Sequence, residues 1–521
     1  MKRWYQKSIV ATILIVLCQL LFFFIPVRAA DTEKEDPYLD INITKEYTYH
    51  TFSLTNDPYS SYQWALENTG LLQYQELLLT GKLGRTVYSK VGMDIRLQEA
   101  WAYYKKKAVN REIIIAIIDT GVDTNQKDLR GHLWINTLEK SNRKDDDQNG
   151  LVDDIHGWNF YDGTKQLYNY SDYNKKTKQY EDDHGTHCAG TIVATPNNGI
   201  GIAGIAGVAN VKLMVIKALG GIEGSEVGTG GTSSIIKAIR YAERMGAQIC
   251  NLSFGGDEVD EALKSTMKNS KMLFICASGN EGKNIDKKPV YPASYDLPNI
   301  ISVGNMNSDG TLSKTSNYGV ESVDLVAPGS EIISTLVKNS YGTMTGTSMS
   351  APMVTGASAL LYSFYPSMTA TDAKKIILKS VTPIKALKNK VKTGGMLNVE
   401  KMLKTKYTPS KANNLSVSLS LKNKKASTAK ILQISVKDRR DLVEVRVARG
   451  DFTIKDFQKK TIGKALSRKK SQSYTIHKSG TYTVYVKDRA GEEKVKKVKV
   501  NIQLSFKNKS KIYKSKVSLL E

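Results

Sequence analysis

The chain has 521 residues, of which 40% are hydrophobic and 24% charged. These fractions are close to globular averages and exclude a wholly disordered, collagenous or coiled-coil protein, while the length allows about two to five domains. The net charge is +24. Residues 411–521 hold 29 Lys and Arg against 9 Asp and Glu, a net charge of +20, so the basic character belongs to a C-terminal module and not to the whole chain.

The N-terminus has the layout of a secretory signal peptide. Lysine and arginine side chains precede an uncharged, mostly apolar run over residues 9–25, and small residues follow it at Ala29 and Ala30. We expect residues 1–29 to be the signal peptide, cleaved after Ala29, and residues 30–56 to form a short N-terminal segment. An uncleaved anchor is the alternative, because the 17 residues of the run are at the lower edge of membrane-spanning length. Export predicts a secreted protein, extracellular or associated with the cell envelope.

Export also predicts an oxidising compartment in which disulfides persist. Beyond the apolar run the chain has three cysteines, Cys188, Cys250 and Cys276, each in an apolar or helical context. This odd number favours small core residues over a disulfide framework.

Strand-length apolar runs alternate with helical patterns through the middle of the chain. Ile235, Ile239 and Ala242 recur at helical spacing between two of these runs. This alternation predicts an α/β fold with a mostly parallel sheet and helices on both faces. Ligands of such sheets bind at the carboxyl ends of the strands. The expected strands are residues 113–118, 213–216, 249–254, 273–277 and 300–303.

Short segments with period-two alternation predict a small all-β sandwich at the C-terminal end. Ser479–Asp488 resembles the penultimate strand of bacterial immunoglobulin-like modules. We therefore expect a linker over residues 406–411, an immunoglobulin-like β-sandwich over residues 412–503 and a basic tail over residues 504–521. The expected strands are residues 415–419, 431–436, 443–447, 474–476, 482–486 and 495–502.

Three phrases in the α/β part carry recognisable chemistry. Asp119–Asp123 reads Asp-Thr-Gly-Val-Asp, His184–Gly190 reads His-Gly-Thr-His-Cys-Ala-Gly, and Gly346–Pro352 reads Gly-Thr-Ser-Met-Ser-Ala-Pro. Together, and in this order, they resemble the signature of the subtilisin-like serine proteases. The resemblance implies a subtilisin-like peptidase domain over residues 57–405, acting as a secreted serine endopeptidase through an acyl-enzyme.

The resemblance implies that Ser348 is the nucleophile, His184 the general acid and base, and Asp119 its orienting partner. A serine hydroxyl needs a base within hydrogen-bond reach, and a buried carboxylate orients that base and stabilises the imidazolium it becomes. Taken alone, Asp119 would be a turn or capping carboxylate. The resemblance further implies that Asn280 donates its side-chain amide to the oxyanion, although Gly-Asn after a strand is by itself an ordinary turn. His187 is expected to be structural.

The resemblance also implies a set of substrate-binding residues, namely Ser253, Gly255, Ala277, Gly279 and Val290. A strand over residues 251–256 is expected to pair with an extended polypeptide, whose main chain gives affinity while pockets give preference. Gly255 leaves room for the side chain before the scissile bond. Val290 stands where smaller residues are common in the family, which predicts a narrower pocket without identifying the preferred side chain.

Two loops are rich in the oxygen ligands that Ca²⁺ prefers. The first is Asp145–Asp154, which is no EF-hand because its twelfth position is His156, and the second, implied by the resemblance, is residues 196–202. A solvated acidic loop and an ordinary Asn-Gly turn are the respective alternatives. The calcium is expected to be structural, with no cofactor required for the chemistry. The expected ligands are Asp145, Asp147, Asn149 and Asp153 for the first loop, and Asn198, Asp57 and Asp128 for the second.

Two features depart from the family pattern. Secreted subtilisins usually carry an inhibitory propeptide of several tens of residues between signal and enzyme, and residues 30–56 are too few for it. Residues 71–96 form an insertion for which the sequence offers no physical account.

Polypeptides are the expected partners of a monomeric enzyme, and a dedicated processing protease for one exported precursor peptide is the alternative function. The signal peptide and the lack of a nucleic-acid motif argue against nucleic acid as the partner of the basic module. We expect this module to bind anionic cell-wall polymers through lysines in excess of its acids, with solubility as the alternative reason for the charge.

Overall fold

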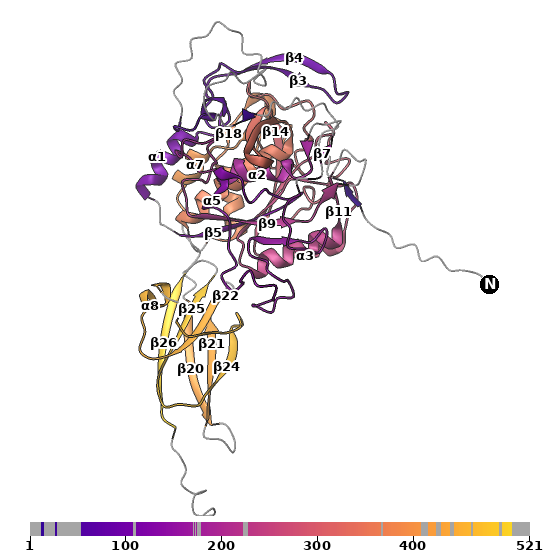
Figure 1. Cartoon of the computed structure of the whole chain (residues 1–521). Helices are drawn as coiled ribbons and strands as arrows, with labels where there is room; N and C mark the ends of the chain where they lie inside the picture. Colours follow the sequence, from indigo (N-terminus) through magenta and orange to yellow (C-terminus); the bar gives the residue numbers. More distant parts are fainter. Residues whose placement is uncertain are drawn as a thin grey trace, which may run out of the picture. The chain divides into compact units, whose positions relative to one another are not determined.

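The chain forms two compact units, Met1–Tyr407 and Thr408–Glu521 (Figure 1). The expected signal peptide, apart from two short strands, lies outside the residues that the structure describes, as do the expected basic tail and most of the expected linker. The computed structural model describes residues 12–14, 27–28, 54–107, 111–169, 171, 173–174, 179–221, 228–365, 368–407, 415–423, 429–437, 442–459, 462–488 and 492–502.

The first unit is built on a nine-stranded sheet with the order β18-β19-β15-β14-β13-β12-β5-β9-β6. All neighbouring strands pair in parallel except β18 with β19. The predicted mostly parallel sheet is therefore confirmed, and every strand expected from the apolar runs is present. The strands are β5 (Ile113–Asp119), β6 (Gly157–Asn159), β9 (Val211–Lys217), β12 (Ile249–Leu252), β13 (Leu273–Ala277), β14 (Ile300–Met306), β15 (Leu325–Pro328), β18 (Thr382–Pro383) and β19 (Gly395–Met396).

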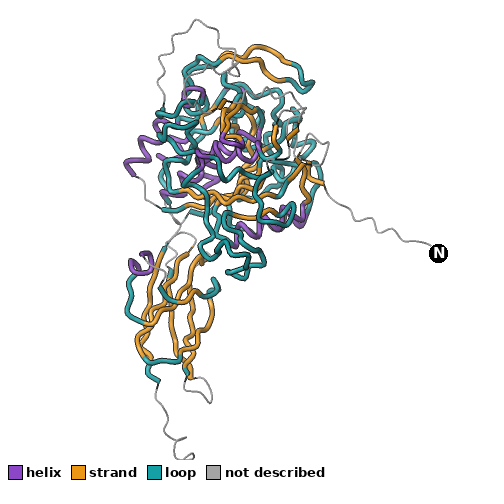
Figure 2. Tube along the Cα trace, viewed as in Figure 1, coloured by secondary structure: helices purple, strands orange, loops and turns teal. Residues whose placement is uncertain are grey.

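Helices cover both faces of this sheet (Figure 2). The side chains of β5 alternate between two buried cores, one on each face of the sheet. Ile115 and Ile117 pack with residues of α2 and α5, whereas Ala116 and Ile118 pack with residues of α3 and α4. Among the described residues, no helix has the length and apolar character needed to cross a membrane. The helices are α1 (Leu97–Lys107), α2 (Asp183–Val193), α3 (Thr232–Arg244), α4 (Glu261–Asn269), α5 (Thr347–Phe364), α6 (Ala370–Lys379) and α7 (Val399–Lys404).

The insertion at residues 71–96 contains a hairpin of β3 (Gln73–Leu77) and β4 (Leu83–Tyr88), at the top of the view in Figure 1. The hairpin is fixed to the loop after β14 by polar contacts. Tyr74 Oη accepts from the backbone N–H of Ser308 at 3.1 Å, and Glu76 Oε1 accepts from Asn307 Nδ2 at 2.7 Å. The insertion is thus a docked element of the first unit.

Smaller elements complete the first unit. One three-stranded sheet has the order β16-β17-β2 and another the order β1-β11-β10, while β7 pairs with β8. The strands are β1 (Thr12–Leu14), β2 (Val27–Arg28), β7 (Tyr173–Asn174), β8 (Gln179–Tyr180), β10 (Gly220–Gly221), β11 (Gly228–Gly231), β16 (Ile332–Leu336) and β17 (Ser340–Met344), and the short 3₁₀ helices are Ser60–Tyr62, Lys127–Leu129, Val337–Asn339 and Lys385–Leu387.

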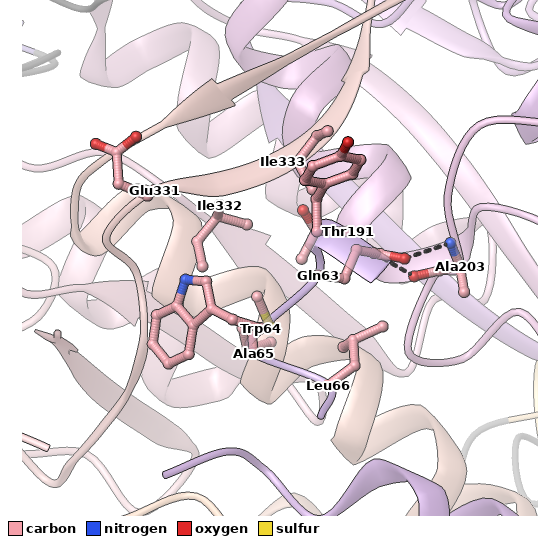
Figure 3. A pocket seen from close by; sticks show the side chains of 11 residues that line it. Gln63, Trp64, Ala65, Leu66, Thr191, Ala203, Glu331, Ile332 and Ile333 are labelled. Carbon is pink, nitrogen blue, oxygen red and sulfur yellow. Dashed lines mark hydrogen bonds between the residues drawn. The ribbon is translucent and has the colours of Figure 1, made fainter. Parts of the chain in front are cut away.

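Within the first unit, the segment before α1 packs against later segments of the chain through Gln63 and Trp64 (Figure 3). Gln63 exchanges two hydrogen bonds with the backbone of Ala203, donating from Nε2 at 2.9 Å and accepting at 2.8 Å. Trp64 Nε1 donates to Ser330 O at 3.0 Å. The cavity beside these side chains has a volume of about 10 Å³, room for about one water, so it is no ligand site.

The second unit is a sandwich of two antiparallel sheets, with orders β20-β21-β24 and β23-β22-β25-β26. Leu432 and Ile434 of one sheet share a buried core with Val445 and Val484 of the other. The predicted all-β sandwich and its expected strands are confirmed, while α8 (Ile454–Lys459) was not expected. The strands are β20 (Ser416–Asn423), β21 (Lys430–Lys437), β22 (Leu442–Arg449), β23 (Lys464–Ala465), β24 (Ser471–Ile476), β25 (Gly480–Asp488) and β26 (Glu493–Val500).

Candidate active site

Asp119 and His184 meet at the carboxyl edge of the main sheet. Asp119 is the last residue of β5, and His184 lies in the first turn of α2. A hydrogen bond of 2.7 Å joins His184 Nδ1 to Asp119 Oδ1, and the two residues are only 2% and 1% exposed. Within the described residues, His184 Nε2 has no hydrogen-bond partner. The imidazole is therefore oriented through Nδ1 and presents Nε2 to a reacting group.

Glycine at position 185 lets α2 approach the turn after Asp119 this closely. A Cβ on Gly185 would lie 2.0 Å from the carbonyl oxygen of Gly121. Gly185 N also donates to Thr120 Oγ1 at 3.2 Å, which links the helix to the turn after Asp119. Any larger residue must move His184 away from Asp119.

Ser348 is the second residue of α5. Its Oγ donates to the carbonyl of Ser253 at 3.0 Å, so the bond from the hydroxyl to His184 is not formed in this state, as is common without substrate. Cys188 connects the two residues: its Sγ lies 3.4 Å from Ser348 O and within 4.8 Å of ligand atoms of Asp119 and His184. The structure thus brings the three predicted triad residues together.

A proline in α5 changes how the Ser348 backbone is held. Pro352 has no N–H, so the carbonyl of Ser348, four residues earlier, lacks its helical partner. Ser253 Oγ donates to that oxygen at 2.9 Å, Asn251 Nδ2 donates to Ser253 Oγ at 2.9 Å, and Thr355 Oγ1 donates to Asn251 Oδ1 at 2.8 Å. This buried network joins β12 to the start of α5, and it turns the Ser253 side chain inward.

Asn280 follows β13 and is oriented by α5. Its Oδ1 accepts from the backbone N–H of Thr347 at 2.8 Å and from Thr347 Oγ1 at 3.1 Å. Gly279 N donates in turn to Thr347 Oγ1 at 3.1 Å. The Asn280 side chain is thus held by the start of α5, and Asn280 and Ser348 line the same cavity.

This cavity has a volume of about 340 Å³. Gly256 and Tyr291 exchange backbone hydrogen bonds of 2.8 and 2.7 Å, which join the two walls. A Cβ on Gly255 would lie 2.7 Å from Val290 Cγ1, so Val290 occupies space opposite Gly255. All the predicted substrate-binding residues line the cavity, namely Ser253, Gly255, Ala277, Gly279 and Val290.

The sequence reading missed the acidic residues of this cavity. Asp257, Glu258 and Glu281 also line it, and Lys283 Nζ lies 2.8 Å from Asp257 Oδ1 and 3.9 Å from Glu281 Oε2. The cavity therefore has an acidic rim that one lysine partly neutralises. The available signal was their position in the sequence: Asp257 and Glu258 directly follow residues 251–256, and Glu281 directly follows Asn280.

The first acidic loop gathers three carboxylates, of which Asp145 and Asp147 were predicted and Glu139 was not. Oxygen atoms of Glu139, Asp145 and Asp147 lie within 4.8 Å of one another. Asp153 is committed elsewhere, because its Oδ2 pairs with Lys165 Nζ at 2.7 Å and its Oδ1 accepts two backbone N–H groups. Asn149 Oδ1 accepts from the backbone N–H of Leu151 at 2.8 Å. Glu139 lies outside the acidic run, so alternating spacing could not identify it.

The second loop brings Asp57, Asp128 and Asn198 close together. Asp57 Oδ1 accepts from the backbone N–H of Asn198 at 3.0 Å, and Asp128 Oδ1 accepts from Asn198 Nδ2 at 2.9 Å. Burial raises the pKa of Asp128 to about 7, and the nearby charge of Asp57 adds to this shift. The close acids are the kind of oxygen donors that suit Ca²⁺.

His187 and the three cysteines are core residues. His187 Nε2 bonds the carbonyl of Ile332 at 2.8 Å, and burial lowers the pKa of its imidazole to about 3. Cys188, Cys250 and Cys276 are free and buried, and burial raises the pKa of each thiol. The cysteines are small core residues, as expected.

Comparison with known proteins places this geometry in a family. The model of the Subtilase family matches residues 110–414. The chain is 39% identical to the major intracellular serine protease of Bacillus subtilis (strain 168) over 276 residues, 52% of this chain and 73% of that protein. It is 28% identical to subtilisin-like protease 1 of Plasmodium berghei (strain Anka) over 383 residues, 69% of this chain and 56% of that protein.

Among solved structures, the crystal structure of a cold-adapted subtilisin-like serine proteinase is 27% identical in sequence. It covers 55% of this chain and 88% of its own, with a TM-score of 0.43. The family match covers more than half of the chain and includes the three motifs. The chain belongs to the subtilase family of serine proteases.

Proposed function

We propose that this subtilase is an exported serine endopeptidase that hydrolyses polypeptides through Ser348, His184 and Asp119. The buried 2.7 Å bond between Asp119 and His184 carries the proposal, because a carboxylate on Nδ1 orients the imidazole and stabilises its protonated form. The layout of the N-terminus supports export.

Substrate binding prepares the nucleophile in this account. An extended polypeptide adds as a strand beside residues 251–256 and brings a backbone N–H to the carbonyl of Ser253. That carbonyl holds the Ser348 hydroxyl at 3.0 Å in the free enzyme. Once the substrate N–H takes its place, the hydroxyl turns to His184 Nε2, which lacks a partner in the described structure.

The chemistry then follows from the positions of these groups. Ser348 Oγ attacks the carbonyl carbon of the scissile bond as His184 Nε2 takes its proton. The oxyanion lies at the N-terminus of α5, where the helix dipole favours negative charge, and accepts from Asn280 Nδ2. Removing such an amide costs about 10²–10³-fold in kcat, a loss known from a subtilisin. His184 protonates the leaving amine, and water hydrolyses the acyl-enzyme by the reverse steps.

The acidic loops support structural calcium as part of the proposal. Glu139, Asp145 and Asp147 form one candidate ligand set, and Asp57 and Asp128 with the 196–202 loop form the other. Clustered carboxylates repel one another, and a hard cation relieves this repulsion. The ion's contribution is to stabilise the fold, with no step of the reaction assigned to it.

The second unit favours retention of the enzyme on an anionic cell envelope. The lysines on strand β26, Lys494, Lys496, Lys497 and Lys499, are all exposed on a module with a net charge of +20. Such an array attracts phosphate-bearing wall polymers without specific contacts, and the attraction weakens in salt. Changing all four lysines to Gln should weaken binding of the full chain to anionic walls at low salt. The matched control changes four exposed lysines of the first unit to Gln, namely Lys385, Lys388, Lys390 and Lys392. Equal losses of wall binding in both variants would contradict retention by β26.

Hydrolysis of a mixed peptide library tests the main proposal. Wild-type protein should cleave internal peptide bonds, and Ser348→Ala should remove this activity while leaving the unfolding curve unchanged. Ser358→Ala is the control, since it removes another buried hydroxyl of α5 that donates only within the helix, to Val354 O at 2.7 Å. Cleavage by Ser348→Ala at the wild-type rate would refute the proposal.

A further inference from the structure

A buried ammonium group lies beside the triad and takes no part in the steps above. Lys217 is the last residue of β9, in register with Asp119 on β5, and only 3% exposed. Its Nζ lies 2.7 Å from a carboxylate oxygen of Glu181 and 2.7 Å from one of Asp182, and it also donates to the carbonyl of Thr120. A lysine ammonium has three N–H donors, and here each has an acceptor.

The acceptors belong to the two segments that carry Asp119 and His184. Thr120 directly follows Asp119, and Asp182 directly precedes α2, which holds His184 in its first turn. The Asp182 carboxylate packs against the turn after Asp119, since a Cβ on Gly121 would lie 2.5 Å from Asp182 Oδ1. Lys217 therefore bonds at once to the Asp119 turn and to the start of the His184 helix.

We propose that Lys217 is a positioning residue that holds Asp119 and His184 in bonding geometry through Thr120 O and Asp182. The inference rests on the proposed triad and deepens it. Burial works to lower the pKa of Lys217, but the carboxylates of Asp182 and Glu181 outweigh it and raise the pKa. The ammonium thus stays charged over the range in which a serine protease works.

The cost of losing this group should appear in catalysis. A misplacement of about 1 Å in a catalytic group can lower the rate about 100-fold. Loss of Lys217 should therefore lower kcat about 100-fold and change KM little, because Lys217 touches no residue that lines the substrate cavity. Removing one partner of a buried ion pair also destabilises a protein, so the test needs a control for stability alone.

The chain offers a matched control in Lys374. Its Nζ pairs with Asp324 Oδ2 at 2.9 Å and also donates to a backbone carbonyl, that of Ile300. Lys374 lies on α6, outside the triad segments. Lys217→Met and Lys374→Met thus remove the same kind of group, one beside the triad and one away from it.

Two readouts on the full chain test the proposal: kcat and KM on a peptide substrate, and the low-field proton resonance of the His184 Nδ1–H in free enzyme. We expect Lys217→Met to lose about 100-fold in kcat and to shift or lose the resonance, and Lys217→Arg to restore both in part. Lys374→Met should lower the melting temperature and leave both readouts unchanged. If Lys217→Met does not fold, Lys217→Met with Asp182→Asn also removes the more deeply buried of the two carboxylates that Lys217 neutralised, and should show the same loss of kcat and resonance.

An unchanged resonance in folded Lys217 variants, or equal losses of kcat in both Met variants, would overturn the positioning role. The resonance needs no substrate, so it tests Lys217 independently of turnover. A wild-type enzyme whose hydrolysis did not depend on Ser348 would instead contradict the proposed function.

Discussion

Pro352 lies four residues after Ser348 in α5 and removes the helical hydrogen bond that the Ser348 carbonyl would otherwise accept. Ser253, which directly follows β12, donates to this carbonyl from its Oγ at 2.9 Å. The backbone of the proposed nucleophile is therefore held by a residue that also lines the candidate substrate cavity. This link between helix and strand gives the first prediction.

Ser253→Ala should leave the Ser348 carbonyl with only the weak thiol donor of Cys188. Loss of a buried hydrogen-bond donor costs about 1–3 kcal/mol, so the free energy of unfolding in urea should fall by about that amount, and kcat should fall with it. Ser358→Ala, whose hydroxyl bonds only within α5, controls for the loss of a buried oxygen. Equal stability and kcat in Ser253→Ala and wild type would contradict a role for this bond.

Gly185→Ala should separate His184 from Asp119. The new Cβ has no room, since it would lie 2.0 Å from Gly121 O, and α2 must shift as a result. We expect kcat/KM to fall at least about 100-fold. Gly231→Ala is the control, because a Cβ there meets no atom within 4 Å. A Gly185→Ala enzyme as active as Gly231→Ala would show that α2 does not need this close approach.

Asp128 predicts how stability depends on pH in the absence of calcium. Its folded pKa of about 7 lies above the ordinary value of 3.8, so the folded state binds more protons than the unfolded state between these values. Stability should therefore fall as the pH rises from about 4 to about 7. Burial also raises the pKa values of Asp182 and Asp183, to about 7 and about 6, so these groups add to the pH dependence of stability. The contribution of Asp128 is therefore measured as the difference in pH dependence between wild type and Asp128→Asn.

Melting temperatures with a calcium chelator, followed from pH 4 to pH 8, measure this difference. Asp128→Asn should lose less stability than wild type over that range. At pH 8, calcium should stabilise wild type more than Asp128→Asn. A site filled at about 100 times Kd adds about 2.7 kcal/mol, and the variant lacks this contribution. Wild type and variant with the same pH dependence and the same response to calcium would contradict both the burial effect and the second calcium loop.

Val290→Gly should widen the substrate cavity. Val290 Cγ1 occupies space opposite Gly255, so wild type should disfavour large aromatic side chains before the scissile bond. The variant should raise kcat/KM for Phe relative to Ala at that position by about 10-fold or more, since a few methylene groups in a pocket are worth about 1–3 kcal/mol. Paired peptides that differ only there measure the ratio, and an unchanged ratio would contradict the assignment of this wall.

The sequence predicted the fold well where apolar runs are uninterrupted. The strand of residues 113–118 could be found because both its faces are buried, and the sandwich strands because their alternation matches one buried face. The family resemblance identified Asp119, His184, Ser348 and Asn280 as candidates, and each of these residues lies at or just after a strand end or at a helix start.

The rest depends on contacts between distant segments. In the sequence, Lys217 is an ordinary lysine at the end of a strand. Only the structure shows that it is buried and has three acceptors. Asp153 has the spacing of a calcium ligand, yet Lys165 and two backbone N–H groups occupy its carboxylate. The acidic rim of the cavity comes from loops after different strands, so only the fold brings Asp257 and Glu281 together.

Covalent labelling of the enzyme with a phosphonofluoridate tests the central claim most directly. The reagent forms a phosphorus–oxygen bond with an activated serine and releases fluoride, which requires a base beside that hydroxyl. Intact mass and peptide mapping should show one adduct per chain, on Ser348, with no adduct in Ser348→Ala and far slower labelling in His184→Ala. An adduct on another serine, or equal labelling rates in wild type and His184→Ala, would contradict the proposed triad.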